Sequence, residues 1–139
     1  MQGVALPMLR DAASPRLRVT DLARGARGWL LWVPPISLLA VASILGSTGR
    51  IAPASEGLLL VAGTAIFGGL CLANAARCGR VHCWVDGTAL PALAAAGALR
   101  LAGVGGIGWS AYLSVLWGIV VLGFLAECVV GPYARRSAP

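Results

Sequence analysis

Four long apolar runs, separated by short polar segments, organise the chain from residue 28 onward. They cover about residues 28–45, 56–76, 84–102 and 109–130. Because a helix needs about 20 apolar residues to cross a bilayer, each run is long enough for one crossing. The pattern predicts an all-α integral membrane bundle of about four transmembrane helices.

Composition supports this prediction and excludes other classes of protein. Of 139 residues, 58% are hydrophobic and 12% are charged, and the mean hydropathy is +0.83. Soluble domains carry about 25% charged residues, so an ordinary soluble enzyme and a secreted disulfide-rich domain are excluded. We expect an Arg-rich arm at residues 1–27, the transmembrane domain at 28–131 and a short tail at 132–139.

The placement of charge predicts the orientation. The net charge is +6, and every basic residue is an arginine. With the N-terminus inside, the inner segments hold Arg10, Arg16, Arg18, Arg24, Arg27, Arg77, Arg80, Arg135 and Arg136, and the outer side holds Arg50 and Arg100. Because positive charge is retained on the cytoplasmic side, we expect a multi-pass protein of the cell membrane with both termini inside. The apolar bulk leaves no surface on which a nucleic acid could bind.

Two features of the predicted helices bear on packing. Ala65, Gly69 and Ala73 are spaced four residues apart, a stripe of small residues that lets another helix approach closely. Arg100 stands near the outer end of the third run, and we expect its side chain to extend to the outer face because a charge at the bilayer centre is costly.

All four cysteines fall toward the inner face in this topology. Cys71 lies less than two turns from the inner end of the second run, Cys78 and Cys83 flank the inner turn, and Cys128 lies in the last turn of the fourth run. Asn74, His82, Asp86 and Glu127 fall in the same layer. Because residues three and four apart share a helix face, Cys71, Asn74 and Cys78 are expected on one face.

Thiols at a cytoplasmic face are kept reduced, and thiolates select soft or borderline metals such as Cu(I), Zn and, by the same chemistry, Hg(II). Arg77 and Arg80 beside the cysteines favour the thiolate. We therefore predict a metal site built from Cys78 and Cys83. The candidates for third and fourth donors are His82, Cys71, Cys128 and Glu127.

Each of these residues also has an ordinary structural interpretation. Cys71 inside an apolar helix is typical of a small packing residue, and Cys128 fits either role. Glu127 in a span is equally explained by an ion pair with an arginine of the inner turn. The spacing Cys78-x4-Cys83 is not a standard zinc pair. A Cys-x-x-Cys pair, a Gly-rich phosphate loop and a Ser-His-Asp set are all absent from the sequence, so we predict that the protein is not an enzyme and holds no permanent cofactor.

The inner turn carries a resemblance. Residues 74–83 read Asn-Ala-Ala-Arg-Cys-Gly-Arg-Val-His-Cys, and Glu127 stands near the end of the last run. A Cys-Gly-Arg-x-His-Cys turn before an apolar span, with such a Glu, resembles small bacterial and archaeal membrane proteins that accompany mercury-resistance genes. It is similar to mercuric-ion transport proteins over roughly residues 57–133. Those importers carry adjacent cysteines in the first helix, which this chain lacks, and this puts direct capture of Hg(II) from an external carrier in doubt.

The function predicted from these features is transport or hand-off of a soft heavy-metal ion, with mercury first, in a heavy-metal resistance system. The expected partners are membrane lipid, the metal ion and a cytosolic acceptor such as a reductase, and a homodimer is plausible for so small a bundle. Two alternatives remain open: a small accessory subunit of a membrane complex with structural cysteines, and a membrane thiol-disulfide oxidoreductase.

Overall fold

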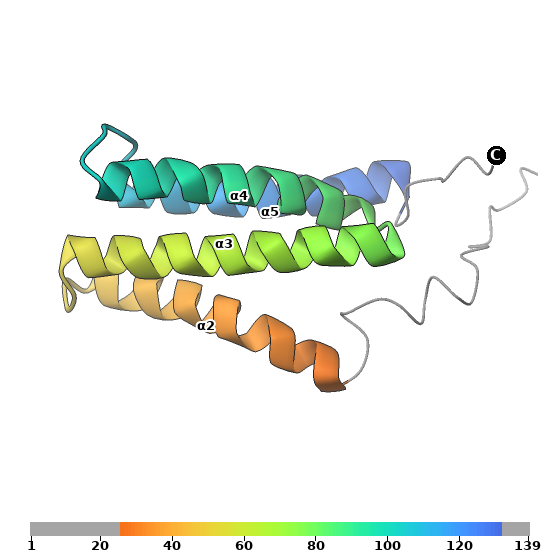
Figure 1. The fold of residues 1–139 in the computed structure, drawn as a ribbon, viewed down its shortest axis with the longest axis horizontal. Coiled ribbons are helices and arrows are strands. Elements are labelled where there is room, and N and C mark those ends of the chain that lie inside the picture. The colour runs from red at the N-terminus through yellow and green to blue at the C-terminus, as the bar shows by residue number, and fades with distance from the viewer. Residues whose placement is uncertain (1–25, 132–139) are drawn as a thin grey trace, which may run out of the picture.

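A computed structural model describes residues 26–131 of the chain, which form an all-α bundle (Figure 1). Its helices, in chain order, are α2 (Ala26–Ser47), α3 (Pro53–Cys78), α4 (Val81–Leu101) and α5 (Trp109–Val130). The predicted all-α fold is therefore confirmed. The predicted arm, apart from its last two residues, and the predicted tail lie outside the described residues.

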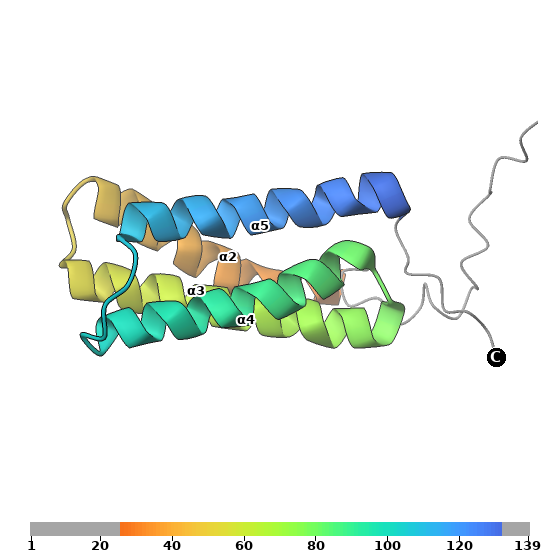
Figure 2. The same cartoon turned by 90° about the horizontal axis from the view of Figure 1, so that it is seen from above.

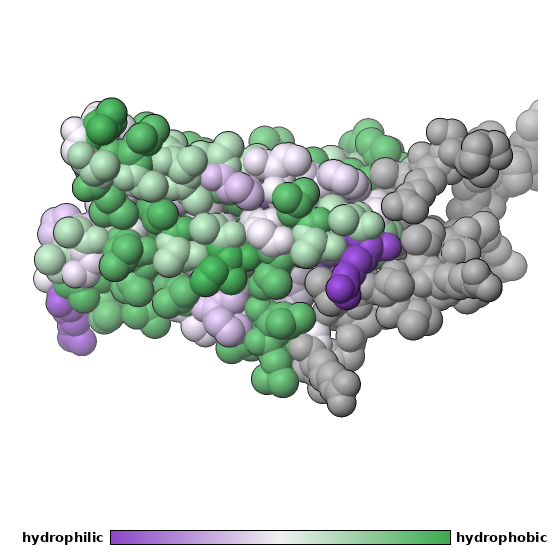
Figure 3. Space-filling model, viewed as in Figure 1, coloured by the Kyte–Doolittle hydropathy of each residue, from purple (hydrophilic) through white to green (hydrophobic). Residues whose placement is uncertain are grey.

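Three of the described helices have the length and composition of membrane spans. Three stretches are long and apolar enough to cross a bilayer: Gly28–Ser47, Pro53–Cys78 and Trp109–Val130. Apolar residues cover most of the side of the bundle, and the strongly hydrophilic ones on the face shown lie toward its two ends (Figure 3). Helix α4 has 21 residues but contains His82, Asp86 and Arg100, so a fourth crossing stays a prediction.

The bundle has two distinct ends, which are visible in Figures 1 and 2. The start of α2, the turn between α3 and α4, and the end of α5 lie together at one end, called the turn end here. The longer connections, residues 48–52 and 102–108, lie at the opposite end, called the loop end. Helix α3 packs mainly against α2 and α4, and α5 packs mainly against α4.

The connection between α3 and α4 is shorter than the polar segment in the sequence suggests. Gly79 adopts a left-handed conformation with φ of 72°, and its N–H donates to the Ala75 carbonyl at 2.9 Å. This is a common way to end a helix, because glycine enters that conformation without steric cost. Helix α4 begins at Val81, so His82 and Cys83 lie in its first turn and not in a loop.

Glycines set the close approach of α3 and α4. A Cβ on Gly68 would lie 2.6 Å from Pro91 Cδ, and one on Gly87 would lie 2.6 Å from the Leu72 backbone nitrogen. In each contact, 68 with 91 and 72 with 87, the two residues lie equally far along the chain from the Gly79–Arg80 turn. This is the register of a regular antiparallel helical hairpin. The predicted small-residue stripe takes no part in this packing: its three residues, Ala65, Gly69 and Ala73, are exposed on the bundle surface.

The apolar core is contributed by all four helices. Its buried members are Leu39 and Ala42 of α2, Leu60 of α3, Leu90 and Leu93 of α4, and Tyr112 and Leu116 of α5. A second, smaller buried cluster contains two of the cysteines and lies nearer the turn end, at the junction of α3 and α4.

Candidate thiol site at the turn end of the bundle

Two cysteines from neighbouring helices face each other inside the bundle. The side chains of Cys71 in α3 and Cys83 in α4 belong to one buried cluster and interact with each other, and their residues are 1% and 0% exposed. Ala75 completes this buried cluster, against which Trp32 and Phe67 pack. We call Cys71 and Cys83 the thiol pair. An apolar wall of this kind excludes water from both sulfur atoms.

The Cys83 sulfur is also contacted by two nitrogen atoms. The Asn74 amide nitrogen donates to it at 3.4 Å, and His82 Nε2 lies 3.2 Å away. Asn74 comes three residues after Cys71, so the two share the face of α3 that meets α4. A proton can reside on Cys83 Sγ or on His82 Nε2, which gives a thiol beside a neutral imidazole or a thiolate beside an imidazolium.

His82 is held from its other side by a carboxylate of α5. Its Nδ1 lies 2.7 Å from Glu127 Oε1, and its ring stacks on Phe124 with centroids 4.7 Å apart. Arg80 donates to the same carboxylate through Nε and Nη2, both at 3.4 Å. A Cys–His–Glu chain therefore runs across α4 and α5, in which the carboxylate fixes the ring orientation, as it does for other histidines that act on a thiol or a metal.

A second carboxyl group is buried one turn further along α4. Asp86 is 1% exposed, and its Oδ1 has no hydrogen-bond partner among the described residues. It faces Gly123 of α5: a Cβ on that glycine would lie 2.6 Å from Asp86 Oδ1. Only a residue without a side chain leaves room for the carboxyl group there, so the packing of α4 on α5 is adapted to it.

The structure brings four of the six predicted donors together and separates two. Cys71, Cys83, His82 and Glu127 form one connected group. Cys78 is buried at the end of α3, seven residues after Cys71, or about 10 Å along the helix axis. Cys128 is exposed on α5. None of the four cysteines, all of which lie within residues 26–131, is in a disulfide.

Two interpretations from the sequence are confirmed. Cys71, Asn74 and Cys78 are all buried on one face of α3, and Glu127 forms an ion pair with an arginine of the turn between α3 and α4, Arg80, at 3.4 Å. Within the described part of the chain, no group of three or more His, Cys, Asp or Glu side chains is arranged to hold a metal ion. The donors that these residues supply are the two sulfur atoms of the thiol pair.

The direct contact of Cys71 with Cys83 and the packing of Asp86 against Gly123 were not foreseen. Asp86 has a signal in the sequence, since an acidic residue in an apolar run is costly unless it has a role. The Cys71–Cys83 contact has none, because it depends on where α3 ends and α4 begins. One residue more in the turn would rotate α4 and move Cys83 off this face.

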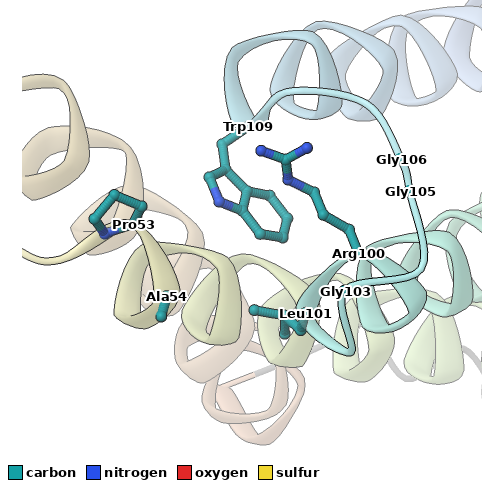
Figure 4. A pocket seen from close by; sticks show the side chains of 8 residues that line it. All are labelled: Pro53, Ala54, Arg100, Leu101, Gly103, Gly105, Gly106 and Trp109. Atoms are coloured by element: carbon teal, nitrogen blue, oxygen red, sulfur yellow. The ribbon is translucent and has the colours of Figure 1, made fainter.

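The loop end holds a different feature, an open pocket of about 500 Å³. Arg100 lies over the Trp109 ring there, with its guanidinium carbon 4.9 Å from the centroid, and the Gly-rich connection passes beside it (Figure 4). Arg100 thus reaches the end of the bundle, as expected, and is paired with an aromatic ring of the kind found at membrane interfaces. This pocket is far from the thiol pair and contains none of the predicted donors.

Comparison with known proteins finds no match: no family, no curated protein and no solved structure matches the chain.

Proposed function

We propose that this protein carries a soft heavy-metal ion, with Hg(II) the first choice, and that the thiol pair of Cys71 and Cys83 is its binding site. The observation that carries the proposal is that these two buried cysteines, one from each helix, lie in one small cluster and interact with each other. Hg(II) is typically bound by two thiolates in a linear arrangement, and thiolate ligands select soft ions over hard ones. Two facing sulfur donors in a dry site meet this requirement without a third ligand.

The neighbouring residues have roles in this scheme. Formation of two sulfur–mercury bonds releases the two thiol protons, and His82 Nε2 is placed to receive the one from Cys83. Glu127 keeps the imidazole in position through its 2.7 Å contact with Nδ1. Asn74 holds the Cys83 sulfur toward α3. The first-choice pair thus moves from Cys78 and Cys83 to Cys71 and Cys83, with Cys78 as a next thiol toward the end of α3.

Release would proceed by thiol exchange toward the turn end. Cys78 is buried at the last residue of α3, and Cys128 is exposed near the end of α5. Successive sulfur ligands allow the ion to pass to a cytosolic acceptor such as a reductase without being released into solution. The cytoplasmic location of the turn end follows from the positive-inside pattern, with Arg77 and Arg80 at that end. The resemblance of the Cys-Gly-Arg-x-His-Cys turn to mercury-resistance membrane proteins supports the same substrate.

The test uses a tryptophan beside the thiol pair. Trp32 packs against the cluster that contains Cys71 and Cys83, so bound mercury, a heavy atom, is expected to quench its fluorescence. A variant in which the other four tryptophans are Phe reports on Trp32 alone. Stoichiometric Hg(II) should quench it, Cys71→Ser and Cys83→Ser should abolish the effect, and Cys128→Ser should not.

Whole-cell accumulation of Hg(II) then tests transport. Cells that make the parent chain should accumulate more mercury than cells that make Cys71→Ser or Cys83→Ser at equal protein level. Quenching and accumulation in both serine variants equal to those of the parent chain would refute the proposal.

The same contact favours a second candidate, a membrane thiol-disulfide oxidoreductase. Two thiols that lie in one buried cluster can be oxidised to a disulfide, and Cys83 with His82 and Glu127 has the arrangement of an activated nucleophile. In that case Cys71→Ser should trap a mixed disulfide between Cys83 and a partner protein. Recovery of such an adduct, together with no mercury binding, would favour this candidate over transport.

A further inference from the structure

The buried carboxyl group of Asp86 is not used by the scheme above. A carboxylate with an unpartnered oxygen in an apolar environment is strongly disfavoured, so the group is expected to be neutral when nothing compensates its charge. The residue is 1% exposed, and the unpartnered Oδ1 points at α5, where Gly123 leaves space for it. A protein that needed only packing at this position would place an apolar side chain there.

The position of Asp86 relative to the thiol pair suggests what the carboxyl group does. It follows Cys83 by three residues, which places the two side chains on the same side of α4 about 5–6 Å apart at their Cβ atoms. The titratable groups whose charges act on it are His82 and Cys83 of its own helix and Glu127 of α5, and its charge in turn acts on Cys71 of α3. A change of charge at the thiol pair is therefore felt by Asp86 with little screening.

We infer that Asp86 is a proton-binding site coupled to the thiol pair, which holds a proton while the pair is empty and releases it when a cation binds there. This inference rests on the proposed function. It adds the source of driving force: the inward movement of one Hg(II) ion is exchanged for outward movement of two protons, one from Asp86 and one from Cys71, while the proton of Cys83 passes to His82. Because the ion brings two positive charges and only the Cys71 proton leaves the thiol pair and His82, these groups gain one positive charge, which the aspartate balances. Protonation of the aspartate in turn favours release of the ion.

Infrared difference spectroscopy of the purified full-length chain tests the protonation directly. The C=O stretching band of a neutral carboxyl group should be present in the metal-free protein and absent from Asp86→Asn. Addition of Hg(II) alone should remove the band in the parent chain and leave it in place in Cys71→Ser. A band that Asp86→Asn retains, or one that Hg(II) leaves unchanged while Trp32 is quenched, would overturn the inference and leave the proposed function standing.

Transport in proteoliposomes provides the second measurement. An acid-inside pH gradient should raise Hg(II) uptake by the parent chain about fivefold, and Asp86→Asn should show a smaller response, because only the Cys71 proton is still exchanged. Glu56→Gln, which changes a carboxylate at the loop end, is the matched control and should respond like the parent chain. A full gradient response in Asp86→Asn would overturn the coupling, whereas uptake that does not depend on Cys71 and Cys83 would refute the proposed function itself.

A third variant covers the case in which Asp86→Asn does not fold. Gly123→Ala keeps the carboxyl group but places a Cβ 2.6 Å from Asp86 Oδ1, so the group must move. The gradient response should fall while quenching of Trp32 by Hg(II) is retained. An unchanged response in this variant would also contradict the inference.

Discussion

His82 Nδ1 lies 2.7 Å from Glu127 Oε1, and this contact joins the first turn of α4 to the end of α5. Arg80, the residue before α4, binds the same carboxylate at 3.4 Å. The two contacts come from residues two apart in one short segment of chain and converge on one acidic residue. The α4–α5 packing at the turn end is therefore fixed by charge, and the orientation of the imidazole beside Cys83 depends on it.

Replacing this carboxylate should weaken both the fold and metal binding. Glu127→Gln removes the charge that Arg80 and His82 contact, so we expect a loss of about 2 kcal/mol in the free energy of unfolding in detergent. Because the histidine loses its orienting partner, Hg(II) affinity should fall about tenfold or more. Denaturant titration and Trp32 quenching measure the two effects. Glu56→Gln at the loop end is the control and should change neither.

The close approach of α3 and α4 makes a second prediction. A Cβ on Gly87 would lie 2.6 Å from the Leu72 backbone nitrogen, an atom that cannot move aside. We expect Gly87→Ala to destabilise the bundle by about 1–3 kcal/mol. Gly69 has nothing within 4 Å of its Cβ position, so Gly69→Ala should be neutral or slightly stabilising, since alanine is the better helix former. Equal effects of the two substitutions on thermal unfolding would contradict the packing described.

The contrast between these glycines shows what the sequence could and could not predict. The four helices follow from the length and hydropathy of the runs, and the ion pair of Glu127 follows from the cost of an acidic residue in a span. Gly69 sits in a regular small-residue stripe and is exposed, whereas Gly87 belongs to no stripe and sits at the contact. Which face of a helix meets its neighbour is set by the pairing of helices in space, and apolar runs surrounded by lipid carry little information about it.

The partner of Cys83 also depends on how the helices pair in space, so the sequence does not predict it. Cys78 and Cys83 are close in sequence and flank the turn, so the sequence favours them as partners. In the structure α3 ends at Cys78, directly before Gly79, and α4 runs back along α3, so that Cys83 lies in the same buried cluster as Cys71. The two-residue connection determines this partner, and helix ends are the least predictable boundaries in a sequence.

Thiol accessibility provides a third prediction, which is independent of any metal. Cys71, Cys78 and Cys83 are buried and Cys128 is exposed. In the folded, detergent-solubilised protein a small maleimide should label Cys128 rapidly and the others only after unfolding in SDS. Mass spectrometry of labelled protein should show one fast adduct, and Cys128→Ser should remove it. Rapid labelling of Cys71 or Cys83 would show that the thiol pair is open to solvent.

Oxidative cross-linking tests the geometry of the thiol pair itself. A mild oxidant such as copper phenanthroline should join Cys71 to Cys83, because their side chains lie in one buried cluster. Peptide mapping should find this disulfide in the parent chain and in Cys78→Ser, and should not find it in Cys71→Ser or Cys83→Ser. The bond closes a loop of roughly a dozen residues, so it should also stabilise the bundle by up to about 3 kcal/mol. A product that joins Cys78 to Cys83 instead would mean that α4 starts later than Val81, and the mercury site would return to the pair flanking the turn.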